Sequence, residues 1–135
     1  MKEPEWLLRE VVLAVHERLL AEFGGSAGIR DPALLESALA RPVNDFGNGS
    51  PTICDLAASY AFGIVKNHPF VDGNKRSGFA AAVMFLELNG RRFTASEAAA
   101  IIRTLALAAG EMTQEEFASW LESNSRGGRV HTGPA

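Results

Sequence analysis

The sequence has only one cysteine, no long apolar run and no cluster of positive charge. With Cys54 as its only cysteine, the chain cannot form an internal disulfide, which favours a reducing compartment. No apolar stretch approaches the ~20 residues that a membrane-spanning helix needs, and the first five residues do not resemble the start of a signal peptide. We therefore expect a cytoplasmic protein that does not contact the membrane.

The charge of the chain is small and evenly spread. Thirteen basic and sixteen acidic residues give a net charge of −3. Because binding driven by nucleic-acid phosphates needs clustered basic residues, this distribution argues against direct nucleic-acid contact. A chain of 135 residues with 47% hydrophobic content forms a single domain, large enough to bury roughly two thirds of its unfolded surface.

The hydrophobic pattern predicts an almost entirely helical protein. Apolar residues recur at three-four spacing over residues 6–23, where His16 is expected to be a surface or hydrogen-bonded histidine because no second metal ligand lies within a turn of it. Asp31 before Pro32 is typical of a helix N-cap. Further helices are expected from Pro51 or Thr52 to Lys66, over 74–88, over 94–109 and over 113–122. The last two are expected to begin with capping boxes, Thr94 with Glu97 and Thr113 with Glu116. The segment 74–88 is apolar on nearly every side, which predicts the central helix of a compact bundle.

Two segments lack helical periodicity. Residues 41–51 contain several helix breakers and an Asn48-Gly49 pair that is typical of a tight hairpin turn. Two interpretations are open: a plain surface loop, or a small flexible hairpin beside an active site. Residues 124–135 have no apolar stripe and are expected to form a disordered tail, so that the folded domain spans 1–123.

Most of the chemistry of the chain lies in the nine residues from His68 to Arg76, between two apolar helices. Gly73 and Asn74 can turn the chain into the second helix, and the unpaired N–H groups of a helix N-terminus form an anion site. Lys75 and Arg76 oppose the helix dipole at that end, which is unfavourable for the helix alone but suits a bound polyphosphate.

Each residue type in the loop fits a step of phosphoryl or nucleotidyl transfer. His68 is the one histidine of the loop, and its side chain can act as a general base and could take a proton from a hydroxyl nucleophile. Asp72 is the only carboxylate of the loop, and Mg²⁺ needs only one or two carboxylates besides waters and substrate phosphates. Gly73 permits close approach of a phosphate, Asn74 adds a side-chain donor, and the two cations would neutralise developing charge. The alternative is a polar surface loop that merely joins two core helices.

This loop resembles the signature of the Fic/Doc family, a histidine-headed loop of the form H-x-F-x-D/E-A/G-N-G/K-R between two helices. The matching residues are His68, Phe70, Asp72, Gly73, Asn74 and Arg76. Residues 24–38 look like the segment that precedes the flap in this family. The resemblance covers about residues 11–123 and implies a compact all-α bundle with a small flap hairpin.

Two positions indicate the Doc (death-on-curing) branch of this family. Fic enzymes that transfer AMP have a second glycine before the arginine and a second arginine three residues after it, whereas this chain has Lys75 and Phe79. Similarity to Doc implies a toxin that phosphorylates a threonine of elongation factor Tu with ATP and so halts translation. AMP transfer stays open as the alternative enzymatic function, and a catalytically silent helical binding module as a third.

The resemblance also implies a role for each site residue. His68 would be the base, Asp72 the ligand of Mg²⁺, and Phe70 an inward-packed anchor. Gly73, Asn74, Lys75 and Arg76 would form the phosphate cradle for ATP, with Lys75 and Arg76 also acting in catalysis. The flap, which would align the target by backbone pairing, corresponds to Asn44, Asp45, Phe46, Gly47, Asn48, Gly49 and Ser50. The chain has no inhibitory S/T-x-x-x-E-G/N helix, so the expected partner is a separate antitoxin whose disordered tail folds on binding.

Overall fold

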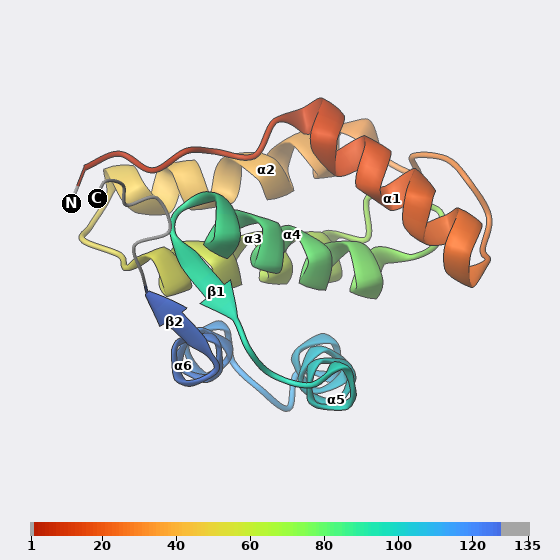
Figure 1. Ribbon diagram of the computed structural model, residues 1–135. Coiled ribbons are helices and arrows are strands. Elements are labelled where there is room, and N and C mark those ends of the chain that lie inside the picture. The colour runs from red at the N-terminus through yellow and green to blue at the C-terminus, as the bar shows by residue number, and fades with distance from the viewer. Residues whose placement is uncertain (1, 128–135) are drawn as a thin grey trace, which may run out of the picture.

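The computed structural model describes residues 2–127, and this part of the chain forms six helices and two short strands (Figure 1). In chain order these are α1 (Arg9–Phe23), α2 (Pro32–Gly47), α3 (Ile53–Asn67), α4 (Asn74–Leu88), β1 (Arg91–Phe93), α5 (Glu97–Ala109), α6 (Gln114–Ser123) and β2 (Ser125–Gly127). The mostly helical architecture confirms the predicted fold class. None of the helices within residues 2–127 is long and apolar enough to cross a membrane.

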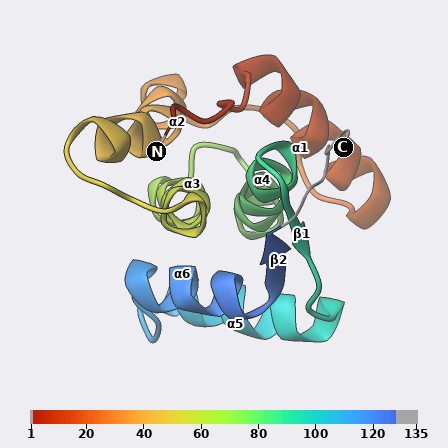
Figure 2. The same ribbon diagram turned by 60° about the vertical axis from the view of Figure 1, so that its left-hand side comes forward.

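The helices form three layers, with α3 and α4 between the other two (Figure 2). On one side α2 packs on α3 and α1 packs on α4, and on the other side α6 packs on α3 and α5 packs on both. The sequence predicted 74–88 as the central helix, and the α4 bounds are as predicted. However, α3 is the more deeply buried of the two, with ten buried residues against seven in α4.

Small residues allow α3 to lie close to its neighbours. A Cβ added to Gly63 would lie 3.2 Å from the Cα of Ala38 in α2, and a Cβ added to Gly78 in α4 would lie 2.8 Å from Cγ2 of Val65. Such contacts are tighter than ordinary packing, so glycine at these positions permits the close approach of the backbones. The close packing of α3 and α4 sets the position of the loop that joins them.

Side-chain caps begin several helices where the sequence predicted them. Asp31 accepts a hydrogen bond from the backbone N–H of Leu34 ahead of α2, and Thr52 and Thr113 form capping boxes ahead of α3 and α6. The predicted Thr94 capping box is wrong. Ser96 caps α5 instead, because the Thr94 hydroxyl donates to the carbonyl oxygen of Asn124 at 2.9 Å.

The first helix also begins later than predicted, at Arg9 rather than at residue 6. The Trp6 ring stacks on the ring of Phe85 in α4, with 5.9 Å between the ring centroids. The backbone N–H of Leu7 donates to the hydroxyl of Tyr60 in α3. The segment before α1 is therefore not helical, and contacts to α3 and α4 hold it in place. Its apolar residues continue the spacing of the helix because they too face the core.

The hairpin predicted within residues 41–51 is wrong, because α2 continues through Pro42 to Gly47. Proline removes one helical hydrogen bond, but Pro42 is fully buried, and its burial against the core offsets this loss. The last turn of α2 is held to the rest of the protein by two contacts. The Ser59 hydroxyl donates to the Asp45 carboxylate at 2.7 Å, and the Phe46 ring packs edge-on against Trp6.

The first residues of the predicted tail are folded. Residues 125–127 form β2, which pairs antiparallel with β1, with Arg92 opposite Arg126. The guanidinium of Arg91 donates to both the hydroxyl and the carbonyl oxygen of Ser125 at 2.9 Å. The prediction that the tail begins at residue 124 is therefore wrong, while residues 128–135 lie outside the part of the chain that the structure describes.

Candidate active site

The loop between α3 and α4 presents the His68 side chain to solvent at the end of α3. His68 has a left-handed backbone conformation (φ 52°), and it is the only non-glycine residue among residues 2–127 with a positive φ. Such a conformation costs about 1–3 kcal/mol. Arg30 stabilises it, because its guanidinium donates to the carbonyl oxygens of His68 (2.7 Å) and Asn67 (2.8 Å). These carbonyls would otherwise be unpaired at the helix end.

Asn74, the first residue of α4, holds the loop together from inside. Its side chain is buried and exchanges two hydrogen bonds with Phe70, accepting from the backbone N–H and donating to the carbonyl oxygen, both at 3.0 Å. Its Nδ2 also lies 3.3 Å from Nδ1 of His68. The sequence predicted a side-chain donor to phosphate here. The structure instead places this amide within the loop and leaves only the backbone N–H of Asn74 for an anion.

The Asp72 carboxylate is exposed and held at a fixed orientation. Oδ1 accepts from the backbone N–H of Gly73 at 3.0 Å, and Oδ2 accepts from the backbone N–H of Ser26 at 3.2 Å. A carboxylate has about four lone-pair sites, so capacity for a cation remains. Residues 2–127 contain no group of three or more acidic, histidine or cysteine residues able to bind a metal ion alone. A single carboxylate beside a phosphate site fits Mg²⁺, which usually takes few protein ligands.

The N-terminus of α4 carries two cations, Lys75 and Arg76, and neither forms a salt bridge within residues 2–127. Its N-cap, Gly73, offers no side-chain cap, so the first N–H groups of the helix are available to an anion. Lys75 and Arg76 are exposed, and the one salt bridge found among residues 2–127 joins Arg9 to Glu36 instead. The guanidinium of Arg76 lies over the ring of Phe23, 4.3 Å from its centroid. This cation–π contact helps to hold the Arg76 side chain in place.

A groove of about 830 Å³ runs from the loop between α4 and α5, within the size range of small-molecule sites. At the loop end it is lined by His68, Asp72, Gly73, Asn74, Lys75 and Arg76. Away from the loop the lining is mostly apolar and includes Phe79, Val83, Met84 and Ile101. The structure therefore brings every predicted residue from His68 to Arg76 that carries polar chemistry to one end of a single groove.

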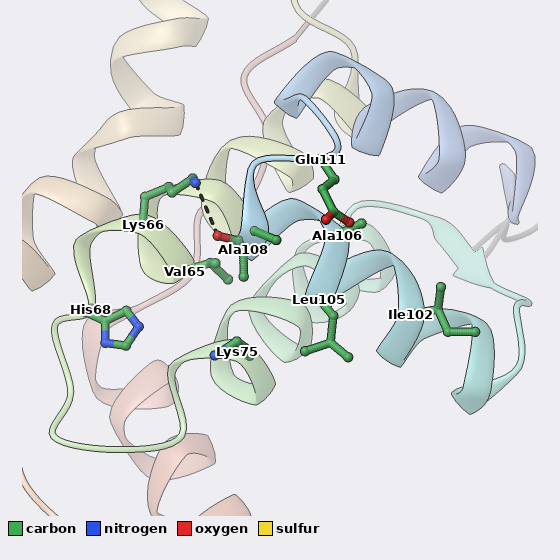
Figure 3. Close-up of a pocket in the computed structure, with 10 residues that line it drawn as sticks. Val65, Lys66, His68, Lys75, Ile102, Leu105, Ala106, Ala108 and Glu111 are labelled. Atoms are coloured by element: carbon green, nitrogen blue, oxygen red, sulfur yellow. Dashed lines mark hydrogen bonds between the residues drawn. The ribbon is translucent and has the colours of Figure 1, made fainter.

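A second pocket of about 690 Å³ lies on the other side of His68. Figure 3 shows it between the end of α3 and α5, with His68 and Lys75 on one side and Leu105 on the other. Lys66 borders this pocket, and its ammonium donates to the carbonyl oxygen of Ala108 at 3.4 Å. His68, Lys75 and Leu105 line both cavities, so the His68 side chain lies between the groove and this second pocket.

The predicted flap, Asn44–Ser50, does not lie beside this loop. It precedes the N-terminus of α3, whereas His68 follows its C-terminus, and the 15 residues of α3 span about 22 Å at 1.5 Å per residue. The segment between α1 and α2 lies beside the loop instead. Ile29 forms an antiparallel bridge with Phe70, and the Val71 N–H donates to the carbonyl oxygen of Gly28. The sequence predicted a flap at Asn44–Ser50 because residues 41–51 contain helix breakers, but α2 continues through Pro42 to Gly47.

His16 is the main site residue that the sequence did not reveal. It is buried in α1, its ring stacks on the Phe70 ring with 3.7 Å between centroids, and its Nε2 donates to the carbonyl oxygen of Asp72 at 2.8 Å. Of the two possibilities predicted for His16, a surface or a hydrogen-bonded histidine, the structure shows the second, and Phe70 is fully buried as predicted. The available signal was position: His16 follows Val12 by four residues, on the same buried face.

Residues 6–86, which contain the whole loop, match the family model described as Fic/DOC family. The chain belongs to the Fic/Doc family. Among its curated Fic/Doc relatives, Toxin Doc of Mycolicibacterium smegmatis is 41% identical over 93 residues, which are 67% of this chain and 69% of that protein. Protein kinase doc of Escherichia phage P1 is 29% identical over 114 residues, 83% of this chain and 89% of that protein. The predicted family is thus confirmed.

Proposed function

We propose that this Fic/Doc protein is a Doc-like toxin that transfers the γ-phosphate of ATP to a hydroxyl side chain of a translation protein. Elongation factor Tu is the first target to test. The observation that carries the proposal is the convergence of His68, the Asp72 carboxylate and the positively charged start of α4 at one end of a groove. The names of the two relatives, a toxin and a protein kinase, support the same function.

The nucleotide would lie with its phosphates at the start of α4. The backbone N–H groups of the first turn and the side chains of Lys75 and Arg76 would bind the phosphate oxygens there. Asp72 would hold Mg²⁺ together with those oxygens, and the ion when bound supplies charge neutralisation on the transferred group. Because Asp72 already accepts two backbone hydrogen bonds, its carboxylate needs little reorganisation to take this role.

His68 would take the proton from the attacking hydroxyl. Its Nδ1 faces the amide of Asn74, so Nε2 is the nitrogen on the opposite side of the ring. For Nε2 to accept a proton, the neutral ring must carry its own proton on Nδ1. The long 3.3 Å contact between Asn74 Nδ2 and His68 Nδ1 would then have to open, because both atoms would be donors. Catalytic hydrogen bonds are often long or poorly aligned before substrate binds, so this contact does not exclude His68 as the base.

Transfer of the γ-phosphate is favoured over transfer of AMP by the surroundings of Phe79. AMP transfer would place the α-phosphate at the start of α4 and needs a cation farther along the helix for the γ-phosphate. Phe79 is half-buried there and packs edge-on against Phe93, with 5.4 Å between centroids. The cations that line the groove are Lys75 and Arg76, both at the loop end. We therefore place the terminal phosphate at this end.

The proposed partner is an antitoxin whose disordered tail folds as a helix on binding. The apolar part of the groove is bordered by α5, where Ile101, Ile102 and Leu105 are 50–63% exposed. Large apolar side chains gathered on one exposed face favour an interaction surface. An amphipathic helix laid along α5 would cover these side chains and would restrict access to the loop end of the groove.

Controlled expression in bacterial cells tests the proposed function. We expect the wild-type protein to stop growth and the incorporation of labelled amino acids into protein. His68→Ala should lose the effect, because loss of a general base lowers the rate of transfer by about 10²-fold or more. Co-expression of the antitoxin should restore growth with the wild type. Unimpaired growth with the wild type, or equal arrest with a folded His68→Ala variant, would contradict the proposal.

A further inference from the structure

Helix α1 buries one polar side chain, and it lies directly beneath the active-site loop. Of the residues in α1, Val12 and His16 are buried. Val12 belongs to the hydrophobic core, whereas His16 stacks flat on Phe70, at an interplanar angle of 10°. A Cβ added to Gly73 would lie 3.6 Å from Nε2 of His16. The imidazole therefore contacts the loop across its width, from Phe70 to Gly73.

The hydrogen bond of His16 acts on one particular peptide group, the one that joins Asp72 to Gly73. Nε2 of His16 lies 2.8 Å from the carbonyl oxygen of this peptide, and because that oxygen can only accept, Nε2 carries the proton. The N–H of the same peptide donates to Oδ1 of Asp72 at 3.0 Å. A peptide group is planar, so the imidazole that fixes its oxygen also fixes its N–H, and thereby the carboxylate.

We propose that His16 is a positioning residue that sets the orientation of the Asp72 carboxylate through the Asp72–Gly73 peptide. It contacts neither nucleotide nor hydroxyl in this arrangement, so its effect is indirect. The inference rests on the proposed function only in that Asp72 is taken to hold Mg²⁺ with ATP. Partners of a metal ligand typically contribute 10–100-fold to metal affinity or activity, which is the size of effect expected here.

Three variants of His16 separate its hydrogen bond from its bulk. His16→Gln keeps an N–H donor near the position of Nε2, His16→Phe keeps the ring on Phe70 without a donor, and His16→Asn has a donor on too short a side chain. Val12→Ala is the matched control, because it opens a cavity in the same buried face of α1 and lowers stability while keeping the His16 side chain and its hydrogen bond to Asp72.

The first measurement is binding of Mn²⁺ in the presence of ATP, followed by electron paramagnetic resonance. We expect His16→Phe to bind about 10–100-fold more weakly than the wild type, and His16→Gln and Val12→Ala to bind like the wild type. Wild-type affinity in His16→Phe, or an equal loss in Val12→Ala, would overturn the proposal. If His16→Phe does not fold, the amide pair decides: we expect a loss in His16→Asn only, and equal affinity of both variants contradicts the positioning role.

The second measurement needs no nucleotide and tests His16 independently of the proposed function. Amide hydrogen exchange of residues 68–76 should be faster in folded His16→Phe than in the wild type and close to wild type in His16→Gln and Val12→Ala. Absence of Mn²⁺·ATP binding in the wild type would mean that the proposed function is wrong, while the exchange rates still decide the role of His16. Unchanged loop exchange in His16→Phe would then refute it.

Discussion

At the scale of single residues, the active-site loop depends on hydrogen bonds from three side chains, of which His16 and Asn74 are buried and Arg30 is exposed. Asn74, His16 and Arg30 together make six hydrogen-bonding contacts with residues 67–72. The sequence predicted the outward-facing residues of this loop, because a histidine, a carboxylate and two cations within nine positions indicate their own chemistry. It assigned Asn74 to phosphate binding because a side-chain amide suits both tasks equally well. The supporting residues His16 and Arg30 are distant in sequence, and only the fold brings them to the loop.

Asn74→Ala tests whether this amide holds the loop. The substitution leaves the buried N–H and carbonyl oxygen of Phe70 without partners, which costs about 1–3 kcal/mol. We expect this loss in the free energy of unfolding, measured by urea denaturation. Lys75→Ala, at the next and exposed position, should change stability by less than about 0.5 kcal/mol while weakening ATP binding. Equal stability of the Asn74→Ala variant and the wild type would show that the amide is not needed for folding.

At the scale of secondary-structure elements, the sequence predicted what local chemistry decides. The caps at Asp31 and Thr113 and the starts of α3 near Thr52 and of α4 at Asn74 follow from adjacent residues. Two features depend on contacts that are distant in sequence, and the sequence did not reveal them. Pro42 is accommodated within α2 because the core covers it, and β2 forms because residues 125–127 meet β1, more than thirty positions earlier.

Truncation tests the contribution of β2. A variant that ends at residue 123 removes the pairing with β1 and the acceptors that Ser125 offers to Arg91. We expect its free energy of unfolding to be lower by about 1 kcal/mol or more, since half-buried donors of Arg91 are left unpaired. The matched control ends at Gly127 and keeps β2, so the comparison isolates residues 124–127. Identical thermal unfolding of the two truncated proteins would mean that β2 adds nothing to stability.

At the scale of the whole molecule, the candidate site lies where the three layers meet. The helix α1 supports the loop from one side, the α3–α4 junction carries the candidate catalytic residues, and α5 forms the opposite wall of the groove. The family match ends at residue 86, whereas α5 begins at Glu97. The loop that carries the candidate site therefore lies within the family match, and the groove wall formed by α5 lies beyond the end of that match.

The most direct test of the whole account is the fate of labelled ATP. Purified elongation factor Tu is incubated with the protein, Mg²⁺ and ATP labelled at either the γ- or the α-phosphate, with His68→Ala in parallel. Because Phe79 offers no cation for a distant γ-phosphate and Lys75 adds charge at the start of α4, we expect γ-label on the target, no α-label, and neither with His68→Ala. Appearance of α-label in a His68-dependent reaction would contradict the account and make this protein an AMP transferase.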